Sequence, residues 1–168
     1  MLRYLPIALL LLLAFVWYRY RQPNFIMGDK APDFEVTLLD GEKARLSDLR
    51  GRYVLLQFWG SWCGPCRAEN PALAALYAQY HGRGFEIFSI GIEQRPEAWK
   101  RAIAADGMAW RYHAMEDQDF TGGQARQYNI HSIPTTFLLN PEGVISGVNL
   151  TPEEISKTLA ERLLTVDR

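Results

Sequence analysis

The sequence predicts an α/β sandwich, and the order of its segments carries that prediction. Tyr53–Trp59 is a nearly continuous apolar run, as expected for a central strand that is buried on both faces of a sheet. Phe85–Ile92 is predicted to be a second strand, and a helical segment follows each of the two. A hairpin pattern precedes them, and a second hairpin and a helix close the chain.

The composition is that of one folded domain with a short appendage. The chain has 168 residues, of which 48% are apolar and 12% aromatic, enough to fill a sizeable core. Its net charge is −1, and Lys and Arg are scattered among Asp and Glu. Nucleic-acid binding usually needs a clustered basic face, so we expect no nucleic-acid partner.

The N-terminal segment differs from the rest because Tyr4–Tyr18 contains no charged residue. With its flanking aromatic and arginine residues it reaches the roughly 30 Å of a bilayer's hydrocarbon core. We predict a transmembrane or signal anchor over 1–21, a linker over 22–30 and a domain over 31–168. A cleaved signal peptide is the alternative, but Phe15–Tyr18 is bulky where a cleavage site needs small residues. Positive charges flank both ends, so they do not fix the orientation.

The first part of the domain is predicted to be a hairpin followed by a strand and a helix. Asp40-Gly41, a pair favoured in tight turns, separates Glu35–Leu38 from Lys43–Leu46. Beyond the central strand, Arg67–Tyr80 is rich in Ala and Leu and carries an apolar stripe, which predicts a helix.

The middle of the chain is predicted to add a helix, a strand and a short helix. Pro96–Ala105 is the helix, and Asp106-Gly107 closes it. Trp110–His113 is the predicted strand. Gly122–Tyr128 is the short helix that leads to Ile133-Pro134.

The C-terminal part is predicted to be a hairpin and a helix. Thr135–Leu139 and Val144–Val148 are the strands, and Asn140–Gly143 has the Pro and Gly positions of a type I turn. Thr151–Glu154 is a capping box with proline at the first helical position, so it predicts the start of the final helix.

The only two cysteines, Cys63 and Cys66, lie three residues apart, between a buried strand and a helix. Free backbone N–H groups at a helix start stabilise a thiolate, which is the attacking species in disulfide exchange. We therefore expect Cys63 to attack a substrate disulfide and Cys66 to release the product. Two alternatives are half of a zinc site and a purely structural disulfide. The scattered histidines have no paired ligand spacing, and so small a ring adds little stability.

The segment Trp62–Cys66, together with Ser132–Thr135, resembles the thioredoxin superfamily. Ala31–Phe34, Leu38–Gly41 and Leu46–Gly51 narrow the resemblance to its TlpA/ResA/DsbE-like branch, over about residues 27 to 165. The resemblance implies a thioredoxin-like sandwich. Its central mixed β-sheet is flanked by helices, with an N-terminal β-hairpin and a central helix–strand insertion.

The resemblance also implies roles for residues around the cysteines. The Ile133–Pro134 bond is expected to be cis beside the pair, with the Ile133 backbone open to a substrate segment. Glu69 is expected to manage thiol protons, and burial would raise its pKa. Gln57 stands where thioredoxins carry a buried aspartate, which leaves Glu69 as the candidate carboxyl. The residues expected to contact substrate are Trp62, Gly64, Pro65 and Ile133.

The expected function is reduction of protein disulfides, through the redox-active Cys63–Cys66 pair and without a bound cofactor. The family suggests a bacterial inner-membrane protein with a periplasmic domain, re-reduced by a transmembrane protein of the DsbD or CcdA kind. Cytochrome c maturation and envelope thiol homeostasis are candidate processes, and we expect a monomer.

Two alternatives belong to other functional classes. One is a peroxiredoxin-type peroxidase, but Leu56 and Gly60 stand where that family needs Pro and Thr or Ser. The other is a non-catalytic, membrane-anchored binding module. The intact cysteine pair argues against this alternative.

Overall fold

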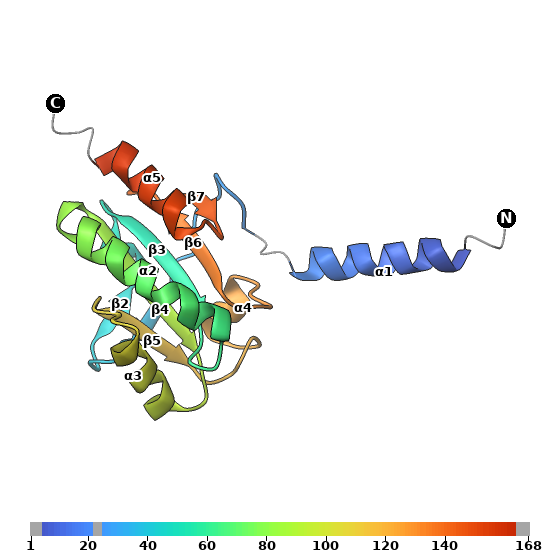
Figure 1. Ribbon diagram of the computed structural model, residues 1–168, viewed down its shortest axis with the longest axis horizontal. Helices are drawn as coiled ribbons and strands as arrows, with labels where there is room; N and C mark the ends of the chain where they lie inside the picture. The colour runs from blue at the N-terminus through green and yellow to red at the C-terminus, as the bar shows by residue number, and fades with distance from the viewer. Residues whose placement is uncertain (1–4, 22–24, 164–168) are drawn as a thin grey trace.

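The computed structural model describes residues 5–21 and 25–163 of the chain. A five-stranded sheet with the order β5-β4-β3-β6-β7 forms its centre (Figure 1). The strands are β3 (Tyr53–Trp59), β4 (Phe85–Ile92), β5 (Tyr112–Glu116), β6 (Thr135–Leu139) and β7 (Ile145–Val148). β3, β4 and β5 run parallel, whereas β6 is antiparallel to both of its neighbours, so the sheet is mixed, as predicted.

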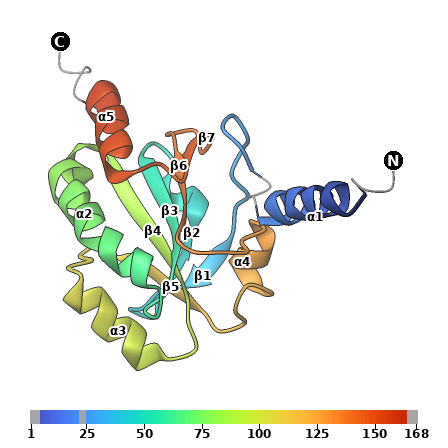
Figure 2. The same ribbon diagram turned by 45° about the vertical axis from the view of Figure 1, so that its right-hand side comes forward.

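Two layers cover the sheet. One layer holds the long helices α2 (Gly64–Tyr80), α3 (Pro96–Ala105) and α5 (Pro152–Leu163), and the other holds the short helix α4 (Gly123–Gln127) with the hairpin of β1 (Glu35–Thr37) and β2 (Lys43–Arg45) (Figure 2). Two 3-10 turns complete the domain, η2 (Leu46–Leu49) after the hairpin and η3 (His81–Arg83) after α2. The predicted α/β sandwich and both predicted hairpins are confirmed.

The central strand β3 divides its side chains between the two layers. Leu55 and Trp59 pack with the helical layer, and Leu56 and Phe58 pack with the hairpin layer. This alternation follows from the two-residue period of a strand. From Val54 to Trp59 every residue is buried, as the apolar run predicts.

Two predicted boundaries differ from the structure. The strand predicted at Trp110–His113 is present but begins two residues later, because β5 starts at Tyr112, where pairing with Phe88 of β4 begins. Trp110 instead turns its indole into the interior, where its Nε1 donates to Ser89 Oγ at 3.0 Å. Helix α2 starts at Gly64, three residues before the predicted start at Arg67.

The residues just before the predicted domain boundary pack against the domain. Gly28 N donates to Ile145 O at 2.8 Å, and Ile145 N donates to Asp29 O at 2.9 Å. The ring of Phe25 lies 5.5 Å from that of Tyr128, a fully buried residue of the hairpin layer. Residues 25–30, which we expected to form part of a linker, therefore belong to the domain, whereas 22–24 lie outside the described residues.

Helix α1 (Leu5–Arg21) covers most of the predicted anchor, and residues 1–4 lie outside the described part. Its apolar side chains from Ile7 to Trp17 are exposed, with Leu10 and Leu11 each at 66%. Among the residues that the structure describes, no helix combines the length and the apolar character that a membrane crossing requires.

Candidate active site

The cysteine pair lies at the junction of β3 and α2. Cys63 and Cys66 form a disulfide with an S–S distance of 2.08 Å and a Cα–Cα distance of 5.3 Å. Cys63 is the N-cap of α2, and its sulfur accepts a hydrogen bond from Cys66 N at 3.2 Å. Pro65 occupies the first turn, where its missing N–H costs no helical hydrogen bond. The expectation that the pair opens a helix is confirmed.

Both cysteines are buried, but to different degrees. Cys63 is 5% exposed and Cys66 is fully buried, so an approaching partner meets Cys63 first. Gly64 is exposed, and a Cβ added there would touch nothing. The position therefore tolerates a side chain, although the chain has none there.

The structure places Ile133 against the cysteine pair, and Glu69 and Pro134 at one cavity. The Ile133–Pro134 peptide bond is cis, as the resemblance implies, and Ile133 packs against the cluster that contains both cysteines. Glu69, on α2, lines a cavity of about 100 Å³ together with Pro134, Thr136, Asn149 and Leu150. Two of the predicted catalytic residues, Glu69 and Pro134, therefore share one cavity.

The Glu69 carboxyl has a raised pKa. Burial is the larger cause, because it disfavours the charged form, and the negative charge of Glu153 on α5 adds to it. The direction is the one predicted for a group that exchanges protons with Cys66. Gln57 cannot do so, since it is an amide, and it lies fully buried with its Nε2 donating to Asn70 Oδ1 at 2.9 Å.

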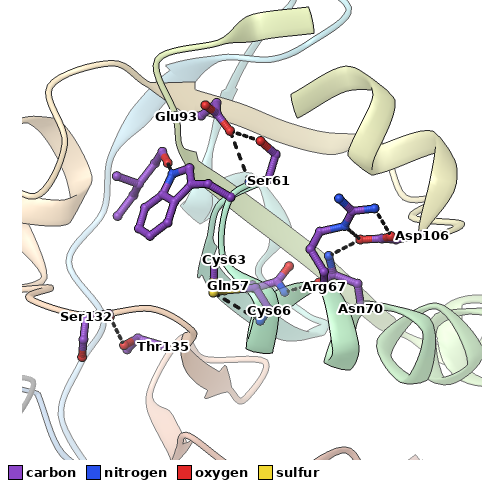
Figure 3. The surroundings of a disulfide bond; sticks show 12 residues. Gln57, Ser61, Cys63, Cys66, Arg67, Asn70, Glu93, Asp106, Ser132 and Thr135 are labelled. Carbon is purple, nitrogen blue, oxygen red and sulfur yellow. Dashed lines mark hydrogen bonds and ion pairs between the residues drawn. A yellow bond between two sulfur atoms is a disulfide. The ribbon is translucent and has the colours of Figure 1, made fainter. Parts of the chain in front are cut away.

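A carboxylate that the sequence did not single out holds the loop ahead of Cys63. Glu93, buried at the end of β4, accepts hydrogen bonds from the Ser61 hydroxyl and from Ser61 N, the latter at 3.2 Å (Figure 3). It also accepts from the backbone N–H groups of Gln94 and Arg95 at 3.1 and 3.0 Å. An acidic residue directly after an entirely buried strand was the only sequence signal for this role.

Trp62 is held next to the same strand end. Its Nε1 donates to Ile92 O at 2.9 Å, yet the side chain is 51% exposed beside Cys63. Gly60 makes room for this arrangement, because a Cβ there would lie 2.8 Å from Trp62 Nε1. Trp62 and Glu93 line a hollow of about 340 Å³ with Gln94, Arg95 and Asp119.

A zinc site at the cysteines would need ligands from the three histidines of the chain, His81, His113 and His131. His113 is buried, where its ring stacks on Trp110 at 5.2 Å and its Nε2 lies 3.2 Å from Met108 O. Burial lowers its pKa to about 4. Within the described ranges, no group of three or more His, Cys, Asp or Glu side chains is arranged to hold a metal ion.

Comparison with known proteins assigns the family. The profile of the AhpC/TSA family matches residues 27–148, most of the chain. The chain belongs to the AhpC/TSA family. Curated relatives of this AhpC/TSA protein include the thiol-disulfide oxidoreductase ResA of Geobacillus kaustophilus, 34% identical over 136 residues, which are 79% of this chain and 76% of the relative.

A second relative and a solved structure agree with this assignment. ResA of Bacillus thuringiensis is 34% identical over 119 residues, which are 71% of this chain but 66% of that protein, slightly less than two thirds. The thioredoxin domain of a Bacteroides vulgatus thiol-disulfide oxidoreductase superposes with a TM-score of 0.76 at 30% identity. That match covers 83% of this chain and 99% of the domain. The AhpC/TSA protein therefore has a thioredoxin-like fold.

Proposed function

We propose that this thioredoxin-like thiol–disulfide oxidoreductase reduces disulfide bonds of partner proteins. The observation that supports the proposal is the position of Cys63 as N-cap of α2, with Cys66 N donating to its sulfur. In the reduced protein the same N–H and the positive helix end would stabilise a Cys63 thiolate. Cys66, one turn further and fully buried, would be the thiol that completes the exchange.

The reaction has two steps. The Cys63 thiolate attacks one sulfur of the substrate disulfide, a Cys63–substrate bond forms, and the other substrate sulfur leaves as a thiolate. Cys66 then loses its proton, for which Glu69 is the acceptor, and attacks Cys63. The second substrate sulfur leaves, and the products are a dithiol substrate and the Cys63–Cys66 disulfide. Two electrons pass from the protein to the substrate.

The proposed contact surface lies around the pair. Exposed Trp62 would cover one side of a bound segment and the backbone of Ile133, before Pro134, the other. The Gly64-Pro65 dipeptide, which resembles that of reducing thioredoxins, favours the reducing direction. We propose re-reduction by a transmembrane protein of the DsbD or CcdA kind, a monomeric enzyme without a bound cofactor, and cytochrome c maturation or envelope thiol homeostasis as the process.

The test is an assay of protein disulfide reduction with a matched peroxide assay. With dithiothreitol as the electron donor, the protein is expected to accelerate reduction of insulin at least tenfold over the donor alone. Turnover of hydrogen peroxide is expected to stay far slower. Peroxide turnover that matches insulin reduction would favour the peroxidase alternative, and no acceleration of either reaction would favour the binding module.

We also propose that α1 tethers the domain to the bacterial inner membrane, with the domain in the periplasm. The support is its row of exposed apolar side chains from Ile7 to Trp17. The full chain is expected to sediment with membranes and to need detergent for release, whereas a variant that lacks residues 1–24 is expected to stay in the soluble fraction. Release of the full chain by salt alone would contradict the tether. A cysteine can be introduced on the surface, far from Cys63 and Cys66. Its labelling by a membrane-impermeant thiol reagent then tests which side of the membrane holds the domain.

A further inference from the structure

A chain of hydrogen bonds runs beneath α2 and ends on a carboxylate. Trp110 Nε1 donates to Ser89 Oγ at 3.0 Å, and Ser89 Oγ donates to Gln57 Oε1 at 2.8 Å. Gln57 Nε2 then donates to Asn70 Oδ1 at 2.9 Å, and Asn70 Nδ2 donates to Asp106 Oδ2 at 2.8 Å. This series of hydrogen bonds therefore crosses β4, β3 and α2 and returns to the segment that follows α3. Figure 3 shows its last part, from Gln57 through Asn70 to Asp106.

The groups at the two ends of this series of hydrogen bonds fix the direction of every bond in it. An indole N–H can only donate and a carboxylate can only accept, so every bond between Trp110 and Asp106 points toward the carboxylate. Ser89, Gln57 and Asn70 are fully buried and have no access to water. The series of buried hydrogen bonds under α2 thus ends at the negatively charged Asp106.

Arg67 balances the charge of Asp106. Arg67 makes a two-pronged ion pair with it, with Nε at 2.5 Å from Oδ2 and Nη2 at 2.7 Å from Oδ1. The hydrogen bond from Arg67 to Asp106 raises the pKa of the guanidinium. Asp106 is also the C-cap of α3, where the helix dipole disfavours a negative charge, so it depends on Arg67.

The ion pair stands beside the redox-active cysteines. Arg67 directly follows Cys66, and Asn70, which binds Asp106, lies one helical turn after Cys66. One turn is about 5 Å along the helix axis, so both charges lie on the order of 10 Å from the sulfurs. A unit charge at that distance, in an effective dielectric constant between about 20 and 80, changes an equilibrium constant roughly two- to sixteenfold.

We propose that the Arg67–Asp106 pair tunes the reduction potential of the Cys63–Cys66 couple by keeping the net charge beside it near zero. The two residues are positioning and tuning groups rather than catalytic ones, because the reaction itself takes place at the cysteines. The disulfide is neutral, whereas the reduced form carries the Cys63 thiolate. An added positive charge therefore favours the reduced form, and an added negative charge favours the disulfide. This inference rests on the proposed redox role of Cys63 and Cys66.

The test is equilibration of the full-length protein with glutathione at pH 7. Two glutathione molecules reduce the Cys63–Cys66 disulfide to the dithiol and become one glutathione disulfide, so the equilibrium constant gives the potential. Asp106→Asn leaves the Arg67 charge unbalanced, and the constant for reduction is expected to rise about threefold, or about 15 mV. Arg67→Gln leaves the Asp106 charge unbalanced, and a fall of similar size is expected.

Opposite shifts separate tuning from a purely structural role. Loss of an ion pair destabilises the fold in both variants, so damage alone would not move the potential in opposite directions. The double variant is expected to return to the wild-type potential although its stability does not recover. Arg67→Lys, which keeps the charge, is expected to stay near wild type. Both single shifts are expected to shrink at high salt.

Shifts in the same direction, or none, would overturn the inference. Arg67 is partly exposed, so its replacement should disturb the fold little. If Asp106→Asn folds poorly, Arg67→Gln is sufficient for the test. The two proposals fail in different ways. A protein that equilibrates with glutathione but does not reduce insulin contradicts the proposed function. One that reduces insulin while both variants keep the wild-type potential contradicts the tuning role.

Discussion

Replacing Cys66 with serine is expected to leave partner proteins covalently attached to Cys63. Without the second thiol, the mixed disulfide formed by Cys63 has no internal group to resolve it. Cys63→Ser is expected to trap at least tenfold less, because Cys66 is fully buried and out of reach of a protein disulfide. Non-reducing electrophoresis of cell extracts, with and without dithiothreitol, measures the adducts, and mass spectrometry identifies the attached cysteine.

The control for trapping is the double variant, which is expected to give no adduct. The fold of Cys63→Ser needs a check by circular dichroism, since a loosened α2 would expose Cys66. Equal trapping by two folded single variants would reverse or remove the assigned roles of attacking and resolving cysteine.

Replacing Glu69 with glutamine is expected to slow insulin reduction by roughly a hundredfold, the lower end of the range for general acid–base effects. The carboxylate form accepts the Cys66 proton, and its pKa is raised by burial. At low pH the group is protonated and cannot accept, so wild-type turnover should rise with pH through the raised pKa of Glu69. The variant should lose this acid limb.

Glu153→Gln is the matched control, because it leaves Glu69 in place and removes a charge that raises its pKa. The acid limb is expected to move to lower pH with the plateau unchanged. Burial, the larger cause, remains, so the move is expected to be small. If Glu69→Gln kept both the rate and the acid limb, Glu69 would be only a half-buried structural residue.

Features that depend on neighbouring residues along the chain were predictable from the sequence. The apolar run of β3, the capping box before α5 and the helix start at Cys63 each lie within a few residues. The pKa direction of Glu69 followed from its spacing on α2 and the family resemblance.

Contacts between distant polar residues were not predictable. Ser61 and Glu93 are 32 residues apart, and Arg67 and Asp106 are 39 apart. Nothing in the local pattern tells which acidic residue a buried donor will meet, because the sheet order decides it. The strand at β5 was misplaced for a related reason, since the Trp110 indole has a polar partner on β4.

The packing of residues 25–30 on the domain has a consequence for how far the enzyme can reach. Between Arg21, the last residue of α1, and Phe25, which contacts Tyr128, the backbone extends at most about 14 Å. With α1 seated in a bilayer as proposed, the domain would be confined to a shallow layer above the lipid headgroups. Disulfides carried close to the membrane surface would be met often, and those on proteins diffusing far from it rarely.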